Sequence, residues 1–419
     1  LHLLSRRQRQ MCIRDRYIDS SMIDYQKKRY VHAIEQYETI FCPDKVAIFS
    51  APGRSEVCGN HTDHQHGMVL ATSINLDTIA VSAKNNNDVV RFVSDGYDMI
   101  TLNINDLEVN DDEAGTTVSL IRGVLRGLKD HGYKIGGFNA YATSDVLVGA
   151  GLSSSAAFEV VVGTIISGLY NDMKINSVEI AQISQYAENV FFKKPCGLMD
   201  QMACSVGGMV NIDFKDPTKP IVKKVPTEFE KYDYSLCIVD TKGDHVDLTD
   251  DYAMIPSEMK KVANFLGEDY LRDCDSNEFY IRLDEIREAV GDRPVLRAIH
   301  FFNEEYNVKN AVSSLENGKF VEFLDAIRKS GNSSFKYLQN VYTTRDIQHQ
   351  NISVALALSE SLLRNYGVCR VHGGGFAGTI QAFVKNDFVS NYKEFINKIF
   401  GENSCHVLKV RKYGGIKVM

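Results

Sequence analysis

The stretch VLVGAGLSSSAA, residues 146–157, decides how this chain is interpreted. It follows an alternating segment at residues 138–143 that predicts a strand, and it opens an apolar segment at residues 156–170 that predicts a helix. Glycines let the backbone approach a phosphate closely, and three successive hydroxyl residues stand where an N-cap belongs, so the helix N-terminus would face an anion. A glycine-rich loop with a serine cap and no ligand is the alternative. The stretch is not a nucleotide P-loop, because no Lys follows the glycines.

Residues 53–67, GRSEVCGNHTDHQHG, form a dense polar run between two predicted strands. Arg54 would neutralise a phosphate or a carboxylate. Three further side chains would hydrogen-bond several hydroxyl groups, as a sugar requires: Asn60, His61 and Asp63. A metal site is a rival, since histidines and an acid cluster here: His61, Asp63, His64 and His66. Alternation along an extended segment would point neighbouring side chains to opposite faces, which disfavours the metal. A solvated loop is the third interpretation.

Two shorter stretches also carry polar chemistry. In PCGLMDQM, residues 195–202, Asp200 lies in a glycine-containing loop with apolar neighbours. A carboxylate there, with a cation nearby, would accept a proton or hold a nucleophilic hydroxyl; an N-capping aspartate is the alternative. In HGGGFAGT, residues 372–379, the glycines require either positive-φ turns or the close approach of another group, and a tight hairpin is the alternative.

The remaining patterns predict an α+β fold in two lobes, because strands and helices alternate without regular βαβ repeats. Strands are predicted at residues 46–49, 69–74, 79–83, 89–93, 138–143, near 369, 379–384 and 407–410. Helices are predicted at residues 24–41, 118–128, 156–170, 178–192, 249–266, 293–315 and 353–366. The segment DPTKPIVKKVP is rich in Pro and Lys and predicts a boundary, so we assign residues 21–220 to a first domain and residues 221–419 to a second.

The beginning of the chain does not match the rest. Residues 1–16, LHLLSRRQRQMCIRDR, hold five Arg and one Asp and show no helical or strand periodicity. A signal peptide would place an apolar block of about 7–15 residues after its basic residues, whereas YIDSSMIDYQKK follows here. We therefore expect residues 1–20 to be a non-native or disordered leader.

Composition excludes several classes of protein. The chain has 419 residues, of which 44% are hydrophobic and 24% charged, as is typical of a globular protein. A formal net charge of −7 without a long basic stripe disfavours nucleic acid and anionic membranes as partners. No apolar run approaches the roughly 18 residues of a membrane helix. The nine cysteines are irregularly spaced and contain no C-x-x-C pair, which predicts free thiols and a cytoplasmic location.

Together and in this order, the four stretches resemble the motifs of the GHMP small-molecule kinases, in particular those of the galactokinases. That family carries G-R-x-N-x-I-G-E-H-x-D-Y near its start, then P-x-G-x-G-L-S-S-S-A-A and G-I-M-D-Q, and G-G-G-F-G-G near its end. Further matches lie at residues 187–189 and 300–304, and at Asp240, Thr241, His245, Tyr252 and Glu258. The resemblance extends from about residue 45 to the C-terminus.

The resemblance implies a two-lobed GHMP kinase fold with its active site in a cleft between the domains. The implied activity is transfer of the γ-phosphate of ATP to the C1 hydroxyl of galactose. Asp200 would be the general base or the anchor for that hydroxyl, and Arg54 would lie between Asp200 and the γ-phosphate. Ser155 and Glu188 would hold Mg²⁺. The loop around the ATP phosphates would comprise Gly149, Ala150, Gly151, Leu152, Ser153, Ser154, Ser155 and Ala156. The implied sugar-binding residues are Asn60, His61, Asp63, Gly197, Tyr252 and Gly374. The implied partners are therefore a small-molecule sugar and ATP, and we expect a monomer or a weak dimer.

Four positions depart from the family pattern. Asn60 replaces a Glu that reaches the sugar near C6 in the family, and His64 replaces a Tyr. Glu56 replaces an Asn, and Leu147 replaces the Pro before the phosphate loop. Loss of the negative charge at position 60 would relax selection at C6 or admit a C6 carboxylate, and residues 63–65 resemble the corresponding stretch of galacturonate kinases. The alternatives are therefore a galacturonate or other C6-modified hexose 1-kinase, and a non-catalytic galactose and ATP sensor. A zinc hydrolase that uses the histidine cluster is a third.

Overall fold

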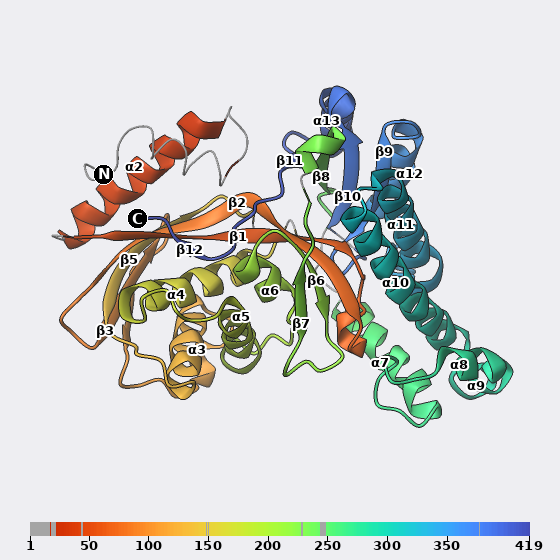
Figure 1. Ribbon diagram of the computed structural model, residues 1–419, viewed down its shortest axis with the longest axis horizontal. Helices are drawn as coiled ribbons and strands as arrows, with labels where there is room; N and C mark the ends of the chain where they lie inside the picture. Colours follow the sequence, from red (N-terminus) through yellow and green to blue (C-terminus); the bar gives the residue numbers. More distant parts are fainter. Residues whose placement is uncertain are drawn as a thin grey trace.

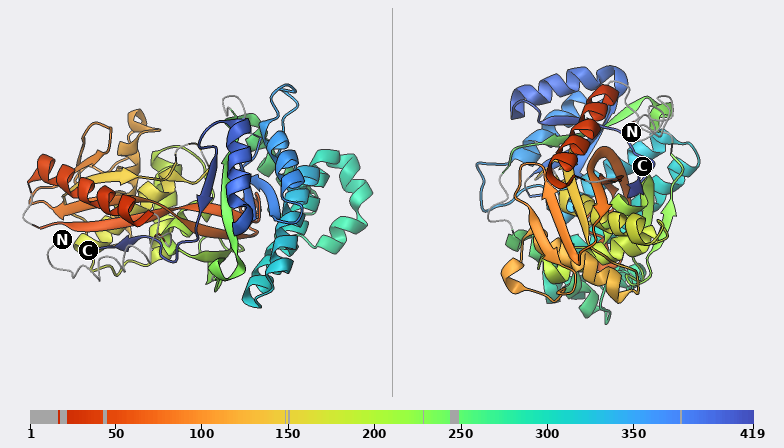
Figure 2. Two further views of the ribbon diagram at one scale, coloured as in Figure 1. Left: turned by 90° about the horizontal axis from the view of Figure 1, so that it is seen from above. Right: turned by 90° about the vertical axis from the view of Figure 1, so that its left-hand side faces the viewer.

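The computed structural model describes residue 17 and residues 22–42, 45–147, 149, 151–227, 229–243, 249–376 and 378–419. Within these residues the chain forms two lobes that lie side by side, each built on its own sheet (Figures 1 and 2). The predicted α+β architecture in two lobes is confirmed. Among the described residues, no helix is long and apolar enough to cross a bilayer.

Most of the expected leader, residues 1–16 and 18–20, lies outside the described residues. Tyr17 is described, and its ring is buried between helix α2 (Ile23–Phe41) and the sheet of the first lobe. Its hydroxyl donates to Asp77 Oδ2 at 2.8 Å, and Arg29 Nη1 donates to Asp77 Oδ1 at 2.7 Å. Tyr17 is therefore part of the first lobe, because both its ring and its hydroxyl have partners there; the assignment of residues 1–20 to a non-native or disordered leader stays a prediction.

The first lobe is built on an eight-stranded mixed sheet with the order β12-β1-β2-β5-β3-β4, which β6 and β7 extend from β2. Only the β3–β5 pair is parallel among the pairs of these strands. The bounds are β1 (Ala47–Cys58), β2 (Met68–Lys84), β3 (Val89–Ser94), β4 (Ile100–Asn103), β5 (Phe138–Ser144), β6 (Met209–Asp213), β7 (Ile221–Lys224) and β12 (Ile416–Lys417).

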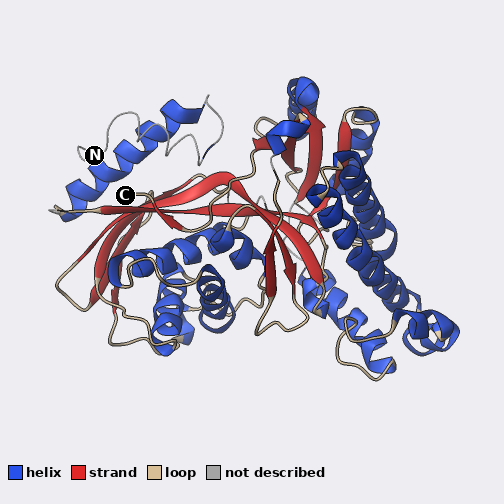
Figure 3. Cartoon of the chain, in the orientation of Figure 1, coloured by secondary structure: helices blue, strands red, loops and turns tan. Residues whose placement is uncertain are grey.

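Strands β1 and β2 are longer than the sequence predicted. β1 continues through residues 53–58, and every residue of it is buried, so interpreting this part of the polar run as a solvated loop is wrong. β2 joins the two strands predicted at residues 69–74 and 79–83. Its residues 68–72 pair with β6 and its residues 78–84 pair with β5. The β1–β2 ribbon thereby extends from the sheet of the first lobe to the helices of the second (Figure 3).

Four helices cover one face of this sheet, and α2 covers the other (Figure 1). The four are α3 (Thr117–Asp130), α4 (Ser154–Tyr170), α5 (Ser177–Tyr186) and α6 (Met199–Val206). α4 is apolar on all sides and is buried accordingly. The helix predicted at residues 178–192 ends as α5 at Tyr186 and continues as a π-helical turn, Ala187–Phe191.

The second lobe is built on a four-stranded antiparallel sheet with the order β11-β8-β10-β9. Its strands are β8 (Tyr234–Asp240), β9 (Gly367–His372), β10 (Thr379–Lys385) and β11 (Cys405–Leu408). α10 (Asp292–Glu316) and α11 (Phe320–Ser333) cover one face, and α12 (Asn351–Leu362) and α13 (Val389–Phe400) cover the other. α7 (Thr249–Phe265), α8 (Ser276–Ile281) and α9 (Leu283–Val290) pack against α10.

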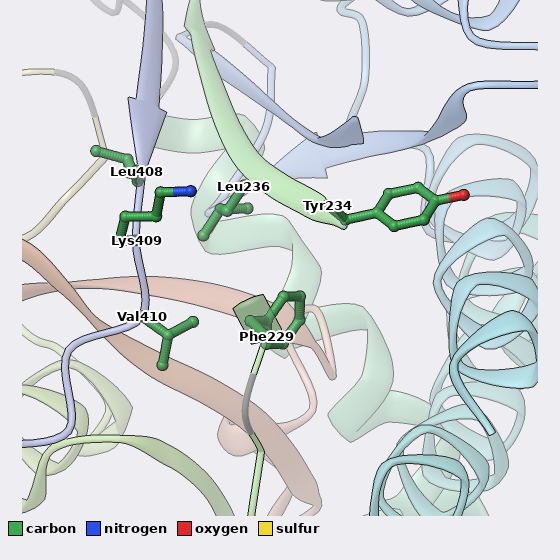
Figure 4. A pocket seen from close by; sticks show the side chains of 6 residues that line it. All are labelled: Phe229, Tyr234, Leu236, Leu408, Lys409 and Val410. Atoms are coloured by element: carbon green, nitrogen blue, oxygen red, sulfur yellow. The ribbon is translucent and has the colours of Figure 1, made fainter. Parts of the chain in front are cut away.

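The two lobes share a hydrophobic core and exchange segments of chain. Buried apolar residues of β1 and β2 form one cluster with residues of β8, α10 and α11. Beside that cluster, a cavity of about 10 Å³ lies where the chain leaves β11 for the first lobe (Figure 4), lined by Phe229, Tyr234, Leu236, Leu408, Lys409 and Val410. β7 lies after the predicted boundary at residue 220, yet it belongs to the first sheet, as does β12. The two sheets therefore do not divide the chain at residue 220, because β7 and β12 follow that residue and lie in the first sheet.

Candidate active site

An ion pair between Arg54 and Asp200 lies at the centre of the candidate site. Arg54 projects from β1, and Asp200 stands in the first turn of α6. Arg54 Nε donates to Asp200 Oδ1 at 2.7 Å, and Arg54 Nη2 donates to Asp200 Oδ2 at 2.7 Å. Arg54 Nη1 also donates to the carbonyl oxygen of Gly151, and the backbone N–H of Arg54 donates to Leu152 O at 3.1 Å. One guanidinium therefore joins the carboxylate to the predicted phosphate loop.

The surroundings of Asp200 keep it ionised. Burial raises the pKa of the Asp200 carboxyl. The charge of Arg54 and hydrogen bonds from Arg54 and Ser153 lower this pKa by a larger amount, so the net pKa lies below the ordinary value. The Asp200 side chain is nonetheless 31% exposed. The carboxylate is thus ionised, oriented on one side by Arg54, and accessible on another. Such a group can hold a hydroxyl and accept its proton.

The predicted phosphate loop leads into the N-terminus of α4. Gly149 and Gly151 have φ angles of 79° and 67°, which glycine adopts readily, and Ser153 has a φ of 57° just before the helix begins. Ser154 and Ser155 occupy the first turn, where backbone N–H groups lack helical acceptors. Leu152 and Ala156 are buried, so they contribute only backbone atoms. Ala150 lies outside the described residues.

The predicted metal ligands Ser155 and Glu188 lie together. Ser155 Oγ donates to Glu188 Oε1 at 3.2 Å, and the π-helical turn carries Glu188 toward α4. Lys194 Nζ lies 3.2 Å from the same oxygen, and Gln201 Nε2 donates to Glu188 Oε2 at 2.7 Å. Neither Lys194 nor Gln201 is among the site residues predicted from the sequence, although Gln201 directly follows Asp200.

Glu159, which lies one turn after Ser155 on α4, is also absent from the predicted site residues. Its side chain is fully buried and accepts from Gln201 Nε2 at 3.2 Å. Burial, followed by the nearby charge of Glu188, raises the pKa of Glu159 well above the ordinary value. The spacing of four residues from Ser155 is the signal that would have placed Glu159 on the same helical face.

The predicted sugar-binding residues gather beside Asp200, drawn from both lobes. The carboxylate of Asp63 packs against the Cα of Gly197, where any side chain would collide with it. The ring of Tyr252, from α7, packs against Gly374 in the same way. His61 Nε2 donates to Gly374 O at 3.0 Å. Burial, then the neighbouring His64, lower the pKa of His61 to about 3, so its ring is neutral. These groups together present hydroxyl, carboxylate and imidazole groups of the kind that bind sugar hydroxyls.

Asn60 is engaged within the protein. It is fully buried, and its Nδ2 donates to Gly373 O at 2.7 Å and to Glu56 Oε1 at 3.1 Å. Its Oδ1 accepts from Asn340 Nδ2 at 2.7 Å. The Asn60 side chain therefore holds the glycine turn at Gly373. A substitution at position 60 would affect sugar selection through the positions of Gly373 and its neighbour Gly374.

Glu56, whose partner the sequence did not indicate, pairs with Arg370 of β9. Arg370 Nη2 lies 2.7 Å from Glu56 Oε1, and Arg370 Nη1 donates to Val57 O at 2.9 Å. Both side chains are almost completely inaccessible, at 4% and 0% exposure. The pair fastens β1 to the second lobe.

The alternative of a metal site in the polar run finds no cluster to support it. In the part of the chain that the structure describes, no group of three or more His, Cys, Asp or Glu residues could hold an ion. His66 stacks on Tyr270 with ring centroids 3.6 Å apart. His245, part of the family pattern, lies outside the described residues.

Comparisons with known proteins match the parts of the chain that contain these residues. The family model for the GHMP kinases N terminal domain matches residues 119–208, which include the predicted phosphate loop and Asp200. The galactokinase galactose-binding signature matches residues 35–84, which include Arg54 and Asp63. A galactokinase of Limosilactobacillus reuteri is 29% identical over 381 residues, covering 88% of this chain and 93% of the relative. A galactokinase of Streptomyces coelicolor is 28% identical, covering 84% of this chain and 88% of that one.

Solved structures show the same fold. The crystal structure of Lactococcus lactis galactokinase complexed with galactose has a TM-score of 0.78 and 23% identity, covering 93% of this chain and 100% of the other. The Methanococcus jannaschii mevalonate kinase has a TM-score of 0.58 and 16% identity, covering 88% of this chain and 99% of the other. The second match shows that the fold alone does not determine the acceptor.

Proposed function

Since this chain is a galactokinase-like member of the GHMP kinases, we propose that it transfers the γ-phosphate of ATP to the anomeric hydroxyl of galactose. The products are galactose 1-phosphate and ADP. The observation that carries this proposal is the guanidinium of Arg54, which binds the Asp200 carboxylate and the Gly151 carbonyl at once. A sugar hydroxyl at Asp200 would then face a phosphate held by the loop.

The arrangement suits phosphoryl transfer, which requires positioning and charge stabilisation more than covalent chemistry. Asp200 holds the C1 hydroxyl and takes its proton as the oxygen attacks the γ-phosphorus, and the bond to ADP breaks. Arg54 keeps Asp200 ionised and faces the charge on the transferring group. The backbone N–H groups at the start of α4 bind the remaining phosphate oxygens.

The sugar is held from both lobes in this proposal. Asp63, with His61 as a neutral ring, binds hydroxyls from the first lobe, and Tyr252 does so from the second. Gly197 and Gly374 allow these side chains to approach, since a Cβ at either position would collide with Asp63 or Tyr252. Sugar binding thereby requires the lobes to stay together.

Mg²⁺ belongs to the same proposal. Ser155 and Glu188 fit this ion, because a hydroxyl and a carboxylate 3.2 Å apart provide the oxygen ligands that it prefers. A bound Mg²⁺ would neutralise negative charge on the β- and γ-phosphates. Gln201 holds the second oxygen of Glu188 and keeps the carboxylate oriented.

Location and assembly are also proposals. The eight described cysteines are free thiols, which supports a cytoplasmic location. We propose a monomer or weak dimer without nucleic acid or membrane partners.

A galacturonate kinase is the second candidate, and the position of His64 favours it. The His64 side chain is 36% exposed and its Nε2 lies 3.9 Å from Asp63 Oδ1, so a protonated imidazole there would attract a carboxylate at C6. The ordered Arg54–Asp200 pair supports a catalyst over a silent sensor.

A panel assay of ADP release tests the proposal. The acceptors are galactose, galacturonate, N-acetylgalactosamine, glucose and mevalonate, each with Mg·ATP. We expect the highest kcat/KM with galactose and no sugar-dependent release from Asp200→Asn. A higher value with galacturonate would transfer the assignment to the second candidate, and release independent of every acceptor would contradict a sugar kinase.

A further inference from the structure

The charges around the phosphate loop are unbalanced for a nucleotide. Two carboxylates stand near the start of α4, Asp200 and Glu188; the nearby Glu159 is not counted with them, because its pKa is raised well above the ordinary value. Arg54 opposes them, but its Nε and Nη2 are bound to Asp200 at 2.7 Å and its Nη1 to Gly151 O. A polyphosphate that arrives here meets a guanidinium with three of its five N–H donors already bound within the protein. A further cation would therefore strengthen binding substantially.

Lys194 is such a cation. Its Nζ lies 3.2 Å from Glu188 Oε1, the oxygen that also accepts from Ser155 Oγ at 3.2 Å. The Lys194 ammonium and the hydroxyl of Ser155, in the first turn of α4, therefore contact the same oxygen of Glu188. Burial lowers the pKa of Lys194, but the charge of Glu188 raises it more, so the group remains protonated. The same positive charge contributes to the lowered pKa of Asp200.

The position of Lys194 allows its head group to move without disturbing Glu188. The Lys194 side chain is 62% exposed, whereas that of Glu188 is 3% exposed. Gln201 Nε2 holds Glu188 Oε2 at 2.7 Å, and the backbone N–H of Lys194 donates to Glu188 O at 3.1 Å. Glu188 thus keeps its orientation when the ammonium leaves, and the backbone keeps Lys194 beside the loop.

We propose that Lys194 binds the nucleotide phosphates, moving from Glu188 to a phosphate oxygen when a divalent cation takes its place on Glu188. This inference rests on the proposed function for the identity of the nucleotide. In the free protein Lys194 balances the charge of Glu188; in the complex it balances the charge of the phosphates. Lysine suits this exchange, because its ammonium is a point charge on a flexible stem.

Isothermal titration calorimetry tests the proposal directly, with AMP-PNP as the ATP analogue, adenosine as the ligand without phosphates, and Mg²⁺ or EDTA in the buffer. We expect Lys194→Met to weaken AMP-PNP binding about tenfold in Mg²⁺, which corresponds to about 1.4 kcal/mol. Adenosine affinity and the KM for the sugar should stay within about twofold. Lys194→Arg should retain most of the affinity, and the matched surface variant Lys174→Met should match the unaltered protein.

The proposed movement of Lys194 from Glu188 to a phosphate oxygen leads to a second prediction. In EDTA, Glu188→Gln should strengthen AMP-PNP binding, because it releases Lys194 and removes a negative charge; adding Lys194→Met should abolish that gain. An AMP-PNP affinity within twofold of the original for Lys194→Met, or an equal loss for adenosine, would overturn the inference. If no sugar is phosphorylated while the calorimetry holds, the proposed function fails and Lys194 remains a phosphate ligand.

Discussion

Strand β1 carries two arginine–carboxylate pairs that are two residues apart and serve different purposes. Arg54 binds Asp200 and Glu56 binds Arg370, each at 2.7 Å. The Asp200 side chain is 31% exposed, whereas that of Glu56 is 4% exposed. The first pair joins elements of one lobe beside the predicted phosphate loop, and the second joins the lobes. The exposure of the carboxylate, rather than its ion pair with arginine, distinguishes a candidate catalytic carboxylate from a structural one.

The electrostatics of the two carboxylates follow the same division. At Asp200, burial raises the pKa but Arg54 and the hydrogen bonds lower it more, so the net pKa falls. At Glu56, burial raises the pKa more than Arg370 lowers it, so the net pKa rises. Asp200 therefore stabilises the fold above its unfolded-state pKa and loses this contribution as the pH falls through its folded-state pKa. Glu56 acts in the opposite sense, and the folded state loses stability as the pH rises through its raised pKa.

The largest effect is expected from Asp200→Asn. The amide cannot accept the proton of the sugar hydroxyl, so kcat should fall by about 10³-fold or more, with ATP affinity nearly unchanged. Steady-state ADP release and calorimetry with AMP-PNP measure the two quantities. A variant with a near-native rate would remove Asp200 from the role of base.

Loss of the second pair, Glu56–Arg370, should lower the stability of the fold. Arg370→Met leaves Glu56 buried without its cation, which should lower the free energy of unfolding by about 3–5 kcal/mol. The double variant Glu56→Gln/Arg370→Met should recover part of this loss, since neither charge is then unpaired. Urea denaturation gives the values. A single variant as stable as the original chain would show that the pair does not hold the lobes together.

A smaller loss of stability is expected from Asn60→Glu. It places a second carboxylate beside Glu56, where Asn60 Nδ2 now donates at 3.1 Å, and it removes the donor to Gly373 O. We expect a loss of about 2 kcal/mol, and a smaller loss in the exchanged variant Glu56→Asn/Asn60→Glu. Folded Asn60→Glu should also raise the preference for galactose over galacturonate. An unchanged ratio of the kcat/KM values for galactose and galacturonate would show that position 60 does not control selection at C6.

The smallest effect concerns pH. Ser153→Ala removes a hydrogen bond that lowers the pKa of the Asp200 carboxyl, so this pKa should rise while Arg54 still holds it down. The acidic limb of kcat/KM should move to higher pH accordingly, with little change near neutrality. An unmoved limb would mean that another group limits the rate in acid.

The sequence predicted the glycine-containing turn and the helix that follows it, because glycines and capping residues act locally; the phosphate-binding role of the turn and the role of Asp200 stay predictions. It did not predict that β1 runs through residues 53–58, since polar residues in a strand resemble a loop until their partners are known. Arg370, which satisfies Glu56, lies in β9 at the far end of the sequence. Only the tertiary structure brings the two together.

Two further differences have local causes. The helix predicted at residues 178–192 changes to a π-helical turn at Ala187, which helical periodicity does not reveal, and this turn places Glu188. Tyr17 was assigned to the leader because of the residues before it, yet its hydroxyl reaches Asp77. The metal and sugar assignments came from a resemblance, and their residues remain proposals.

Nuclear magnetic resonance of the product tests the central claim most directly, using galactose, Mg·ATP and the full chain. We predict one sugar phosphate whose phosphorus couples to the anomeric proton, formed in equal amount with ADP and absent with Asp200→Asn. Phosphate on any other hydroxyl, or ADP formed without a sugar phosphate, would contradict the geometry assigned to Asp200 and Arg54.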